Sequence, residues 1–457
     1  MKLLVNLNNF NTKSTNNTLK YGKNKVNKYT QGENDMTNKY KLIVVGGGLT
    51  GVAAAVCASR RGIKTLLVEA SGCLGGAISQ NLIYPFMRYY YFTDNSDNKE
   101  RNFLSKGFFL EFVEKLRSIG HMKGYGEFET EYVKILLDEY IEESGADVLF
   151  HANLCNVHTD GSSVKSIDVA TKAGILNFEA DYFIDATGDG DLMAFAGCEY
   201  QIGREKDGLC QPMTLCFRAV NADDKMFQEE YPKQIDALYN EWQKLGKIKN
   251  VREDVLLFKG LGKGIVHFNS TRIVKLNPVD PFDVSKAEMM ARKQMIELFD
   301  FLKENFESFK DAILAFSAVS IGVRESRKLV GEHVVTAEEL VACTRFDDSI
   351  AVADYDIDIH SPDGSGTSHY YFPNGKYYTI PYRSLQPKEF NNLLVGGRCL
   401  SATHEAQASI RIMPTCACLG EAAGVAVALA SKNNCGVKDI DIKTLQNMLE
   451  ENGARIY

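Results

Sequence analysis

The sequence predicts an α/β fold of the Rossmann type that carries an inserted α+β domain. Three observations support this prediction. An apolar strand, a glycine-rich turn, a helix and a second apolar strand follow one another within residues 40–69. Residues 200–375 then change to short strands and amphipathic helices, and a final apolar strand followed by glycines returns at 391–397. A chain that leaves its first sheet and later rejoins it is typical of a domain with an insertion.

The first strand and turn have the pattern of a dinucleotide site. Lys41–Val45 is apolar and β-branched, as in a buried parallel strand. Gly46, Gly48 and Gly51 follow as G-x-G-x-x-G, and Val52–Arg61 is rich in alanine. The first glycine permits a tight turn, the second lets a pyrophosphate approach the backbone, and the third lets the helix pack on the strand. The free N–H groups at the helix start then attract the phosphates.

The acid at the end of the next strand narrows the choice of ligand. Lys64–Val68 is apolar and Glu69 follows directly, where a carboxylate would accept hydrogen bonds from the ribose hydroxyls of the adenosine. The same negative charge would repel a 2′-phosphate, which disfavours NADP. NAD and FAD both remain open on this evidence.

Later segments favour FAD over NAD. Gly75 and Gly76, in "SGCLGGAIS", place a second flexible turn beyond the ribose-binding strand, as a cofactor longer than NAD requires. The stretch 391–430 ends in a nearly apolar helix opened by Pro414 and Thr415, and such a helix should be buried. Its N-terminus, aimed at the C2 carbonyl of a flavin, would stabilise the negative charge of the reduced ring.

Taken together, these segments resemble a known family. "GGGLTG", "EASGCLGG", "DATGDGD", "NPVDPFDVSKAE", "GVRESRKLVGE", "YTIPYRSL" and "GGRCLSATHEAQASIRIMPTCACLGEAAG" occur in this order. The chain thereby resembles the FAD-dependent oxidoreductases of the glutathione-reductase-2 superfamily, which are related to the flavin subunits of heterodisulfide and fumarate reductases. The resemblance extends from about residue 40 to about residue 430.

The resemblance implies a set of residues that bind FAD. They are Gly46, Gly48, Gly51, Glu69, Gly75, Gly76, Gly188, Gly397, Arg398, Met413 and Thr415. One departure concerns the last strand, where many relatives carry Gly-Asp and this chain carries Gly397-Arg398. No metal site is implied.

The chain divides into four expected segments. Residues 1–38 are rich in Asn and Lys and should form a disordered extension, so that Met36 is an alternative to Met1 as the start. Residues 39–199 and 376–457 should form the two parts of an FAD domain, a three-layer ββα sandwich that ends in a terminal helix. Residues 200–375 should form the substrate or cap domain, with helices at 223–245 and 284–306.

Four side chains outside the nucleotide motif are candidates for catalysis. His404 is a candidate general acid or base, because an unperturbed histidine side chain exchanges its proton near neutral pH. A structural histidine hydrogen-bonded near the cofactor would give the same sequence pattern. Arg411, seven residues later, would hold a substrate carboxylate, stabilise an anionic flavin, or form a buried ion pair. Arg324 lies in a dense charge cluster that could equally be structural. Tyr382 lies where the chain re-enters the FAD domain, a natural wall for a cleft.

These features predict a flavoenzyme that transfers a hydride between a small organic substrate and flavin N5. No second nucleotide motif is visible, so electrons should come from a substrate or go to an acceptor protein. The alternative is an electron-transfer subunit that acts with a partner protein. The net charge of −7 argues against a nucleic-acid partner, and no apolar run reaches the length of a membrane span. The oligomeric state is left open.

The cysteines indicate a reducing compartment. None of the eleven cysteines forms a C-x-x-C pair, so redox disulfides and ferredoxin-type clusters are not expected. We expect reduced thiols in a cytoplasmic protein.

Overall fold

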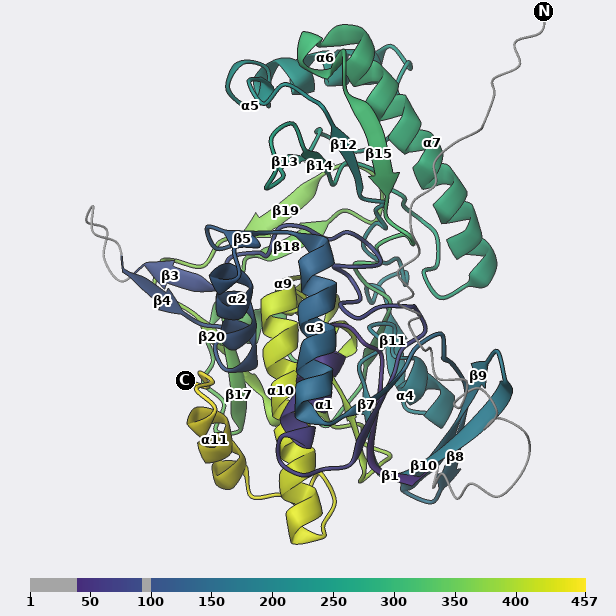
Figure 1. Ribbon diagram of the computed structural model, residues 1–457, viewed down its shortest axis with the longest axis vertical. Helices are drawn as coiled ribbons and strands as arrows, with labels where there is room; N and C mark the ends of the chain where they lie inside the picture. Colours follow the sequence, from purple (N-terminus) through teal and green to yellow (C-terminus); the bar gives the residue numbers. More distant parts are fainter. Residues whose placement is uncertain (1–38, 93–99) are drawn as a thin grey trace, which may run out of the picture. The chain divides into compact units, whose positions relative to one another are not determined.

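The computed structural model describes residues 39–92 and 100–457 as a mixed α/β protein, drawn in Figure 1. The predicted disorder of residues 1–38, and with it the choice of start, lies outside the described residues.

A seven-stranded sheet carries the nucleotide motif. Its order is β7 (Asp147–Leu149), β2 (Thr65–Val68), β1 (Lys39–Val45), β10 (Gly174–Asp185), β9 (Ser163–Thr171) and β8 (Asn153–Asp160), with β21 (Leu393–Val395) also paired to β10. Strand β10 pairs differently along its two halves. Its first half pairs antiparallel with β9, and its second half pairs parallel with β1 and β21. The strand that returns from the C-terminal part of the chain is therefore next to the A-T-G strand.

The side chains of β1 alternate between two cores, which gives the molecule its layers. Leu42 and Val44 pack with the helices, whereas Ile43 and Val45 pack with the meander β8–β10. The helices on the first face include α1 (Leu49–Ser59), α3 (Thr130–Ser144) and α10 (Met413–Asn433). The expected ββα sandwich of a Rossmann-type domain is confirmed.

Helices α1 and α10 pack unusually closely. A Cβ on Gly420 would overlap the carbonyl oxygen of Thr50, and one on Gly424 would overlap that of Ala54. The Thr50 hydroxyl donates to the Cys416 carbonyl at 3.1 Å. The two helices therefore begin beside each other. Helix α10 is long and apolar enough to cross a membrane, but 89% of its most apolar window is buried inside the protein, as in a core helix.

A second sheet forms the inserted region with its own core. Its order is β13 (Leu257–Lys259), β14 (Val266–Phe268), β12 (Phe217–Val220) and β15 (Ile313–Ser317). Phe217 stacks on Phe268 with ring centroids 4.2 Å apart, and both join a core built with α6 (Lys233–Lys244) and α7 (Pro281–Asn305). These elements lie together in Figure 1.

Two expectations about elements were inaccurate. The single helix expected at 223–245 is broken into α5 (Met226–Glu229) and α6, with Pro232 as the N-cap of α6. Proline disfavours helical geometry in the residue before it, which ends the first helix. Strand β8 was not anticipated, because Val157 is its only buried residue and the apolar alternation that marks a strand is absent.

The remaining elements are shorter. They are β3 (Tyr90–Phe92), β4 (Arg101–Phe103), α2 (Phe108–Ser118), β5 (Met122–Lys123), β6 (Glu127–Phe128), α4 (Asp191–Ala196), β11 (Tyr200–Ile202), β16 (Arg327–Leu329), α8 (Ala337–Val341), β17 (Ser349–Ala353), β18 (Ile357–His360), β19 (Thr367–Tyr370), β20 (Tyr378–Pro381), α9 (His404–Ile410) and α11 (Ile442–Glu451), with 3₁₀ turns at Glu307–Phe309, Tyr382–Leu385 and Gly397–Cys399.

Candidate functional site

The three motif glycines serve two different purposes. Gly46 has a φ of +102°, and a Cβ there would overlap the Ala186 carbonyl. A Cβ on Gly51 would overlap the carbonyl oxygen of Gly46. Both residues are thus required by the fold itself. Gly48 differs, because the nearest atom to its Cβ would be the Cα of Gly76, 3.9 Å away. The space beside Gly48 is open and suits the approach of a phosphate group.

The start of α1 is left free for a ligand. Its N-cap, Gly48, provides no side-chain hydrogen bond, and its first turn contains no acidic residue. The second glycine turn lies against the first, because Gly75 N donates to Gly47 O at 2.9 Å. A Cβ on Gly76 would come within 2.8 Å of the Gly48 Cα. Unsatisfied N–H groups and bare backbone therefore meet where the pyrophosphate of FAD was expected, and the residues fit that group.

Glu69 is held at the edge of this turn. Its Oε2 accepts from Gly47 N at 2.6 Å, and its Oε1 accepts from Ser71 N at 2.7 Å. A carboxylate has about four acceptor positions, so it can receive ribose hydroxyls in addition. The ribose role of Glu69 stays a prediction.

A buried acid shapes the A-T-G turn. Asp185 accepts hydrogen bonds from Thr187 N, the Thr187 hydroxyl and Met193 N at 2.7–3.0 Å. Burial raises the pKa of this carboxyl to about 6, although these hydrogen bonds oppose the shift. The turn brings Gly188 under Arg398, whose Nη2 would lie 3.0 Å from a Cβ at Gly188.

Arg398 is already engaged by the protein. Its Nη2 pairs with Asp189 Oδ1 at 2.8 Å, and its Nη1 donates to Ser326 Oγ at 3.2 Å. Arg398 thus occupies the position at which many relatives carry the aspartate of a Gly-Asp pair. Its charge is neutralised by Asp189, which belongs to the A-T-G turn. Its contact with the cofactor remains a prediction.

The N-terminus of α10 also has unsatisfied polar groups. No side chain caps the helix at Ile412, and Pro414 lies in its first turn. The Thr415 hydroxyl oxygen is buried without a hydrogen-bond partner among the described residues. Gly397 lies close by, since a Cβ there would come within 2.6 Å of the Thr50 hydroxyl. An orphaned hydroxyl beside free N–H groups fits the polar edge of a flavin ring, with Met413 at the same helix start.

His404 is the first residue of α9 and lies beside the buried ion pair of Glu325 and Lys328. Thr403 caps this helix by accepting from Ala406 N. The Nδ1 atom of His404 lies 2.7 Å from Glu325 Oε2, and Lys328 Nζ lies 2.5 Å from Glu325 Oε1. Burial would raise the pKa of Glu325, but the hydrogen bond from His404 and the charge of Lys328 outweigh it and hold that pKa below its ordinary value.

A cavity of about 920 Å³ opens beside His404. It is lined by His404 and Glu405 of α9, by residues 204–206 after β11, and by residues of the β18–β19 hairpin between 359 and 368. Its volume falls in the range of small-molecule sites.

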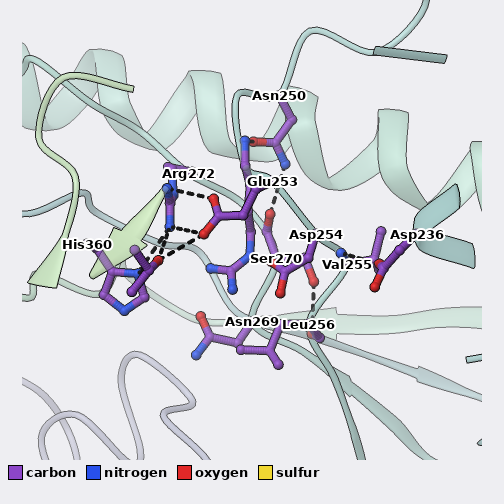
Figure 2. Close-up of polar contacts among 12 residues, drawn as sticks. Asp236, Asn250, Glu253, Asp254, Val255, Leu256, Asn269, Ser270, Arg272 and His360 are labelled. Atoms are coloured by element: carbon purple, nitrogen blue, oxygen red, sulfur yellow. Dashed lines mark hydrogen bonds and ion pairs between the residues drawn. The ribbon is translucent and has the colours of Figure 1, made fainter. Parts of the chain in front are cut away.

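The hairpin that forms one wall of the cavity is anchored by Arg272 (Figure 2). The guanidinium of Arg272 is buried and pairs with Glu253 at 2.8 Å. It also donates to the carbonyl oxygens of Gly364 and Gly366, in the hairpin turn, and lies 3.1 Å from His360 Nδ1. The inserted region therefore holds the cavity wall through charge-assisted hydrogen bonds.

Two arginines have few acidic partners among the described residues. Arg324 donates to Pro212 O at 2.7 Å, to the Thr214 hydroxyl, and to Asn269 Oδ1 at 3.3 Å. All three acceptors are neutral. Burial, and next the charge of Arg411, lower the pKa of Arg324 to about 9.

Arg411 lies on the same side of α9 as Gln407, whose amide donates to the Arg324 carbonyl at 3.0 Å. Its closest acid is Asp358, at 4.0 Å, and its Nε is buried without a partner among the described residues. The pair of arginines therefore carries more positive charge than its surroundings neutralise.

The structure excludes Tyr382 from the site. Its side chain is 0% exposed in the helix-side core, and its hydroxyl donates to the Val437 carbonyl at 2.8 Å. A substrate has no surface of this residue to contact, so the catalytic role predicted for Tyr382 is wrong. Tyr382 was expected to line a cleft because the chain re-enters the FAD domain at this position. Its ring instead packs in the core.

Sequence reasoning missed Glu325 and Lys328 as partners of His404. The E-x-x-K spacing in "RESRK" was a signal, because a buried acid and base that close in sequence can pair. It could not reveal His404, which lies 79 residues away from Glu325. Asp185, which organises the A-T-G turn, was also not singled out.

Comparison with known proteins gives the family. The model of the FAD-dependent oxidoreductase family matches residues 41–449. No curated protein matches the chain. Solved structures with a similar fold include p-nitrophenol 4-monooxygenase from Pseudomonas putida, with 10% identity over 91% of this chain and 88% of that one and a TM-score of 0.47. L-proline dehydrogenase from P. horikoshii matches with 11% identity over 91% and 98% and a TM-score of 0.44.

A geranylgeranyl bacteriochlorophyll reductase-like protein from Thermoplasma acidophilum shares 13% identity over 90% of this chain and 83% of that one, with a TM-score of 0.42. These likenesses are remote, so the assignment rests on the family match and on the nucleotide-binding geometry described above. The chain belongs to the FAD-dependent oxidoreductase family, and it is an enzyme that uses FAD.

Proposed function

We propose that this enzyme oxidises or reduces a small organic substrate that carries an anionic group, by hydride transfer between a substrate carbon and flavin N5. The observation that carries the proposal is Arg324, whose hydrogen bonds all go to neutral acceptors and whose pKa is lowered by burial and then by the positive charge of Arg411.

A half-buried cation without a counter-ion is costly. Desolvation disfavours the charged guanidinium, and a second positive charge nearby adds repulsion. Asp358 is too distant from Arg411 for a close ion pair, at 4.0 Å. A carboxylate or a similar anion between the two guanidiniums would relieve both costs and would fix the orientation of the substrate.

The remaining residues have distinct tasks. Bound FAD supplies the two-electron acceptor, which takes or gives a hydride. Gly48, Gly76 and the start of α1 would hold the diphosphate, and the start of α10 would lie toward the flavin. His404 takes or returns the proton of the substrate hydroxyl or amine. The hairpin held by Arg272 forms the cavity wall on the substrate side.

The test is anaerobic reduction of the FAD-loaded enzyme by a panel of paired compounds. Each pair contains a hydroxy or amino acid and its uncharged amide, and reduction is followed as loss of the visible flavin absorption. We expect the acids to reduce the flavin. For the best acid, Arg324→Met should lower kcat/KM by about 10²-fold or more, because the lost contact is a charged and partly buried one.

Arg292→Met is the matched control, because Arg292 pairs with Glu288 on the exposed side of α7. It should leave kcat/KM unchanged. Equal reduction by acids and amides would contradict the anionic substrate. Reduction only by a partner protein, and by no small compound, would instead support the electron-transfer alternative.

A further inference from the structure

We propose that Glu325, fixed by Lys328, is a positioning residue that keeps the proton of His404 on Nδ1 and presents Nε2 to the cavity as a proton acceptor. The transfer of a proton between the substrate and His404 rests on the proposed function. The proton's location on the ring does not, because it is a property of the protein alone.

Both oxygens of Glu325 are hydrogen-bond acceptors. Oε2 accepts from Gln211 N at 3.0 Å and lies 2.7 Å from His404 Nδ1. Oε1 accepts from Lys328 Nζ at 2.5 Å, and the same Nζ donates to Gly203 O at 2.8 Å. An ionised carboxylate can only accept hydrogen bonds. The Nδ1 atom must therefore be the donor, and in the neutral tautomer with a proton on Nδ1 the lone pair is on Nε2.

The Nε2 atom is free and accessible. His404 is only 5% exposed, yet it lines the cavity beside the β18–β19 hairpin. Within residues 39–92 and 100–457, Nε2 forms no hydrogen bond to the protein. It is not among the buried side-chain atoms that lack a hydrogen-bond partner, so it keeps some exposed surface. Its remaining exposed surface therefore faces the cavity, where a substrate would lie.

Lys328 changes what Glu325 does to the imidazole. A lone buried carboxylate would favour the imidazolium and would make His404 a poor proton acceptor. Lys328 neutralises that carboxylate, so Glu325 orients the ring without trapping the added proton. Other charged residues line the cavity beside the ring, namely Arg204, Glu205, Lys206 and Glu405. Arg324 directly precedes Glu325 in the chain.

The proton transfer balances simply. In an oxidation, the substrate O–H or N–H bond breaks, its proton forms a bond with Nε2, and its electron pair stays on the heteroatom. The adjacent carbon then loses a hydride to FAD, and the imidazolium passes its proton to water in the cavity. A reduction runs through the same positions in reverse.

Deuterium exchange at the Cε1 position of histidine, measured by peptide mass spectrometry across a pH series, reports each ring separately. The FAD-loaded protein would be compared with Glu325→Gln and Lys328→Met. We expect the pH midpoint of His404 exchange to fall by about one unit in Glu325→Gln and to rise by about one unit in Lys328→Met. Shifts of opposite sign would show that the charges of Glu325 and Lys328 both act on the imidazole ring of His404.

Lys438→Met is the control, because Lys438 forms a Lys–Glu ion pair with Glu332 at 2.7 Å that is solvent-facing and does not involve His404. It should leave the His404 midpoint in place, and the exposed His158 should be unchanged in every variant. Shifts in the same direction, or no shift in either variant, would overturn the proposal.

A second measurement needs no variant. Diethyl pyrocarbonate acylates accessible, unprotonated imidazole nitrogens, and the modified peptides can be identified by mass. His404 should react more slowly than His158, whereas His267, which is 1% exposed, should stay unmodified. Complete protection of His404 would refute an accessible Nε2. Either result stands apart from the substrate panel, so failure of the proposed function would not be mistaken for failure of this inference.

Discussion

Single residues show how one motif combines folding and binding. Gly51 and Gly46 are required because any Cβ would overlap backbone, whereas Gly48 lies beside open space. The motif is therefore not a uniform run of flexible positions. Its outer glycines shape the turn, and its middle glycine leaves room for the cofactor.

This contrast predicts opposite outcomes for two alanine substitutions. Gly48→Ala should leave the free energy of unfolding of the FAD-free protein within about 0.5 kcal/mol of wild type, but should raise the Kd for FAD at least tenfold. Gly51→Ala should lower the free energy of unfolding by about 1–3 kcal/mol. Urea unfolding and fluorescence titration with FAD measure the two quantities. Equal destabilisation by both changes would contradict the assignment.

Glu421 predicts a pH dependence of stability. Burial raises the pKa of this α10 carboxyl to about 7, against opposing hydrogen bonds from Phe108 N and Asn452. The folded protein thus binds a proton that the unfolded chain has lost, and stability must fall as pH rises from about 4.5 to 7. Glu421→Gln should remove a fall on the order of 3 kcal/mol.

Urea unfolding at intervals between pH 5 and pH 8 measures this effect. Glu332→Gln, at a solvent-facing ion pair, serves as control and should keep the wild-type slope. An unchanged slope in Glu421→Gln would show that another group is responsible.

At the scale of elements, the pairing of α1 with α10 decides whether both helix starts can serve one ligand. Gly420 and Gly424 let the helices approach so closely that Thr50 bonds to Cys416. The helix starts that we predict to bind the phosphates and to face the flavin are therefore positioned by one helix contact.

We accordingly expect Gly420→Ala to separate the helices. It should lower the free energy of unfolding by about 1–3 kcal/mol and weaken FAD binding as well, because both helix starts shift. Lys432→Ala, at the exposed end of α10, should change neither property. Thermal unfolding with and without FAD provides the measurement, and a normal FAD affinity in a destabilised Gly420→Ala would contradict the coupling.

At the scale of the whole molecule, the features that could be predicted from the sequence are those that depend on a few adjacent residues. The strand at 41–45, the glycines after it and the apolar helix after Pro414 each carry their pattern in a few adjacent residues, and the fold followed from them. Strand β8 could not be anticipated, because an edge strand buries too little to show alternation.

The catalytic surroundings depended on long-range contacts. Glu325 and His404 come together from positions 79 residues apart, and Tyr382 is fully buried in the helix-side core. Pattern reasoning found which side chains could do chemistry. It could not decide which of them would face a cavity, since that depends on how the inserted region packs.

Strand β10 is shared by the β8–β10 meander and the parallel part of the sheet. Its first half belongs to the meander and its second half to the parallel sheet, and it ends at Asp185, which holds the A-T-G turn below Arg398. A displacement of the β8–β9 hairpin along the strand axis would therefore pass through one continuous backbone to the turn that contains Gly188. A load on that distant surface would reach a residue that we predict to bind the cofactor.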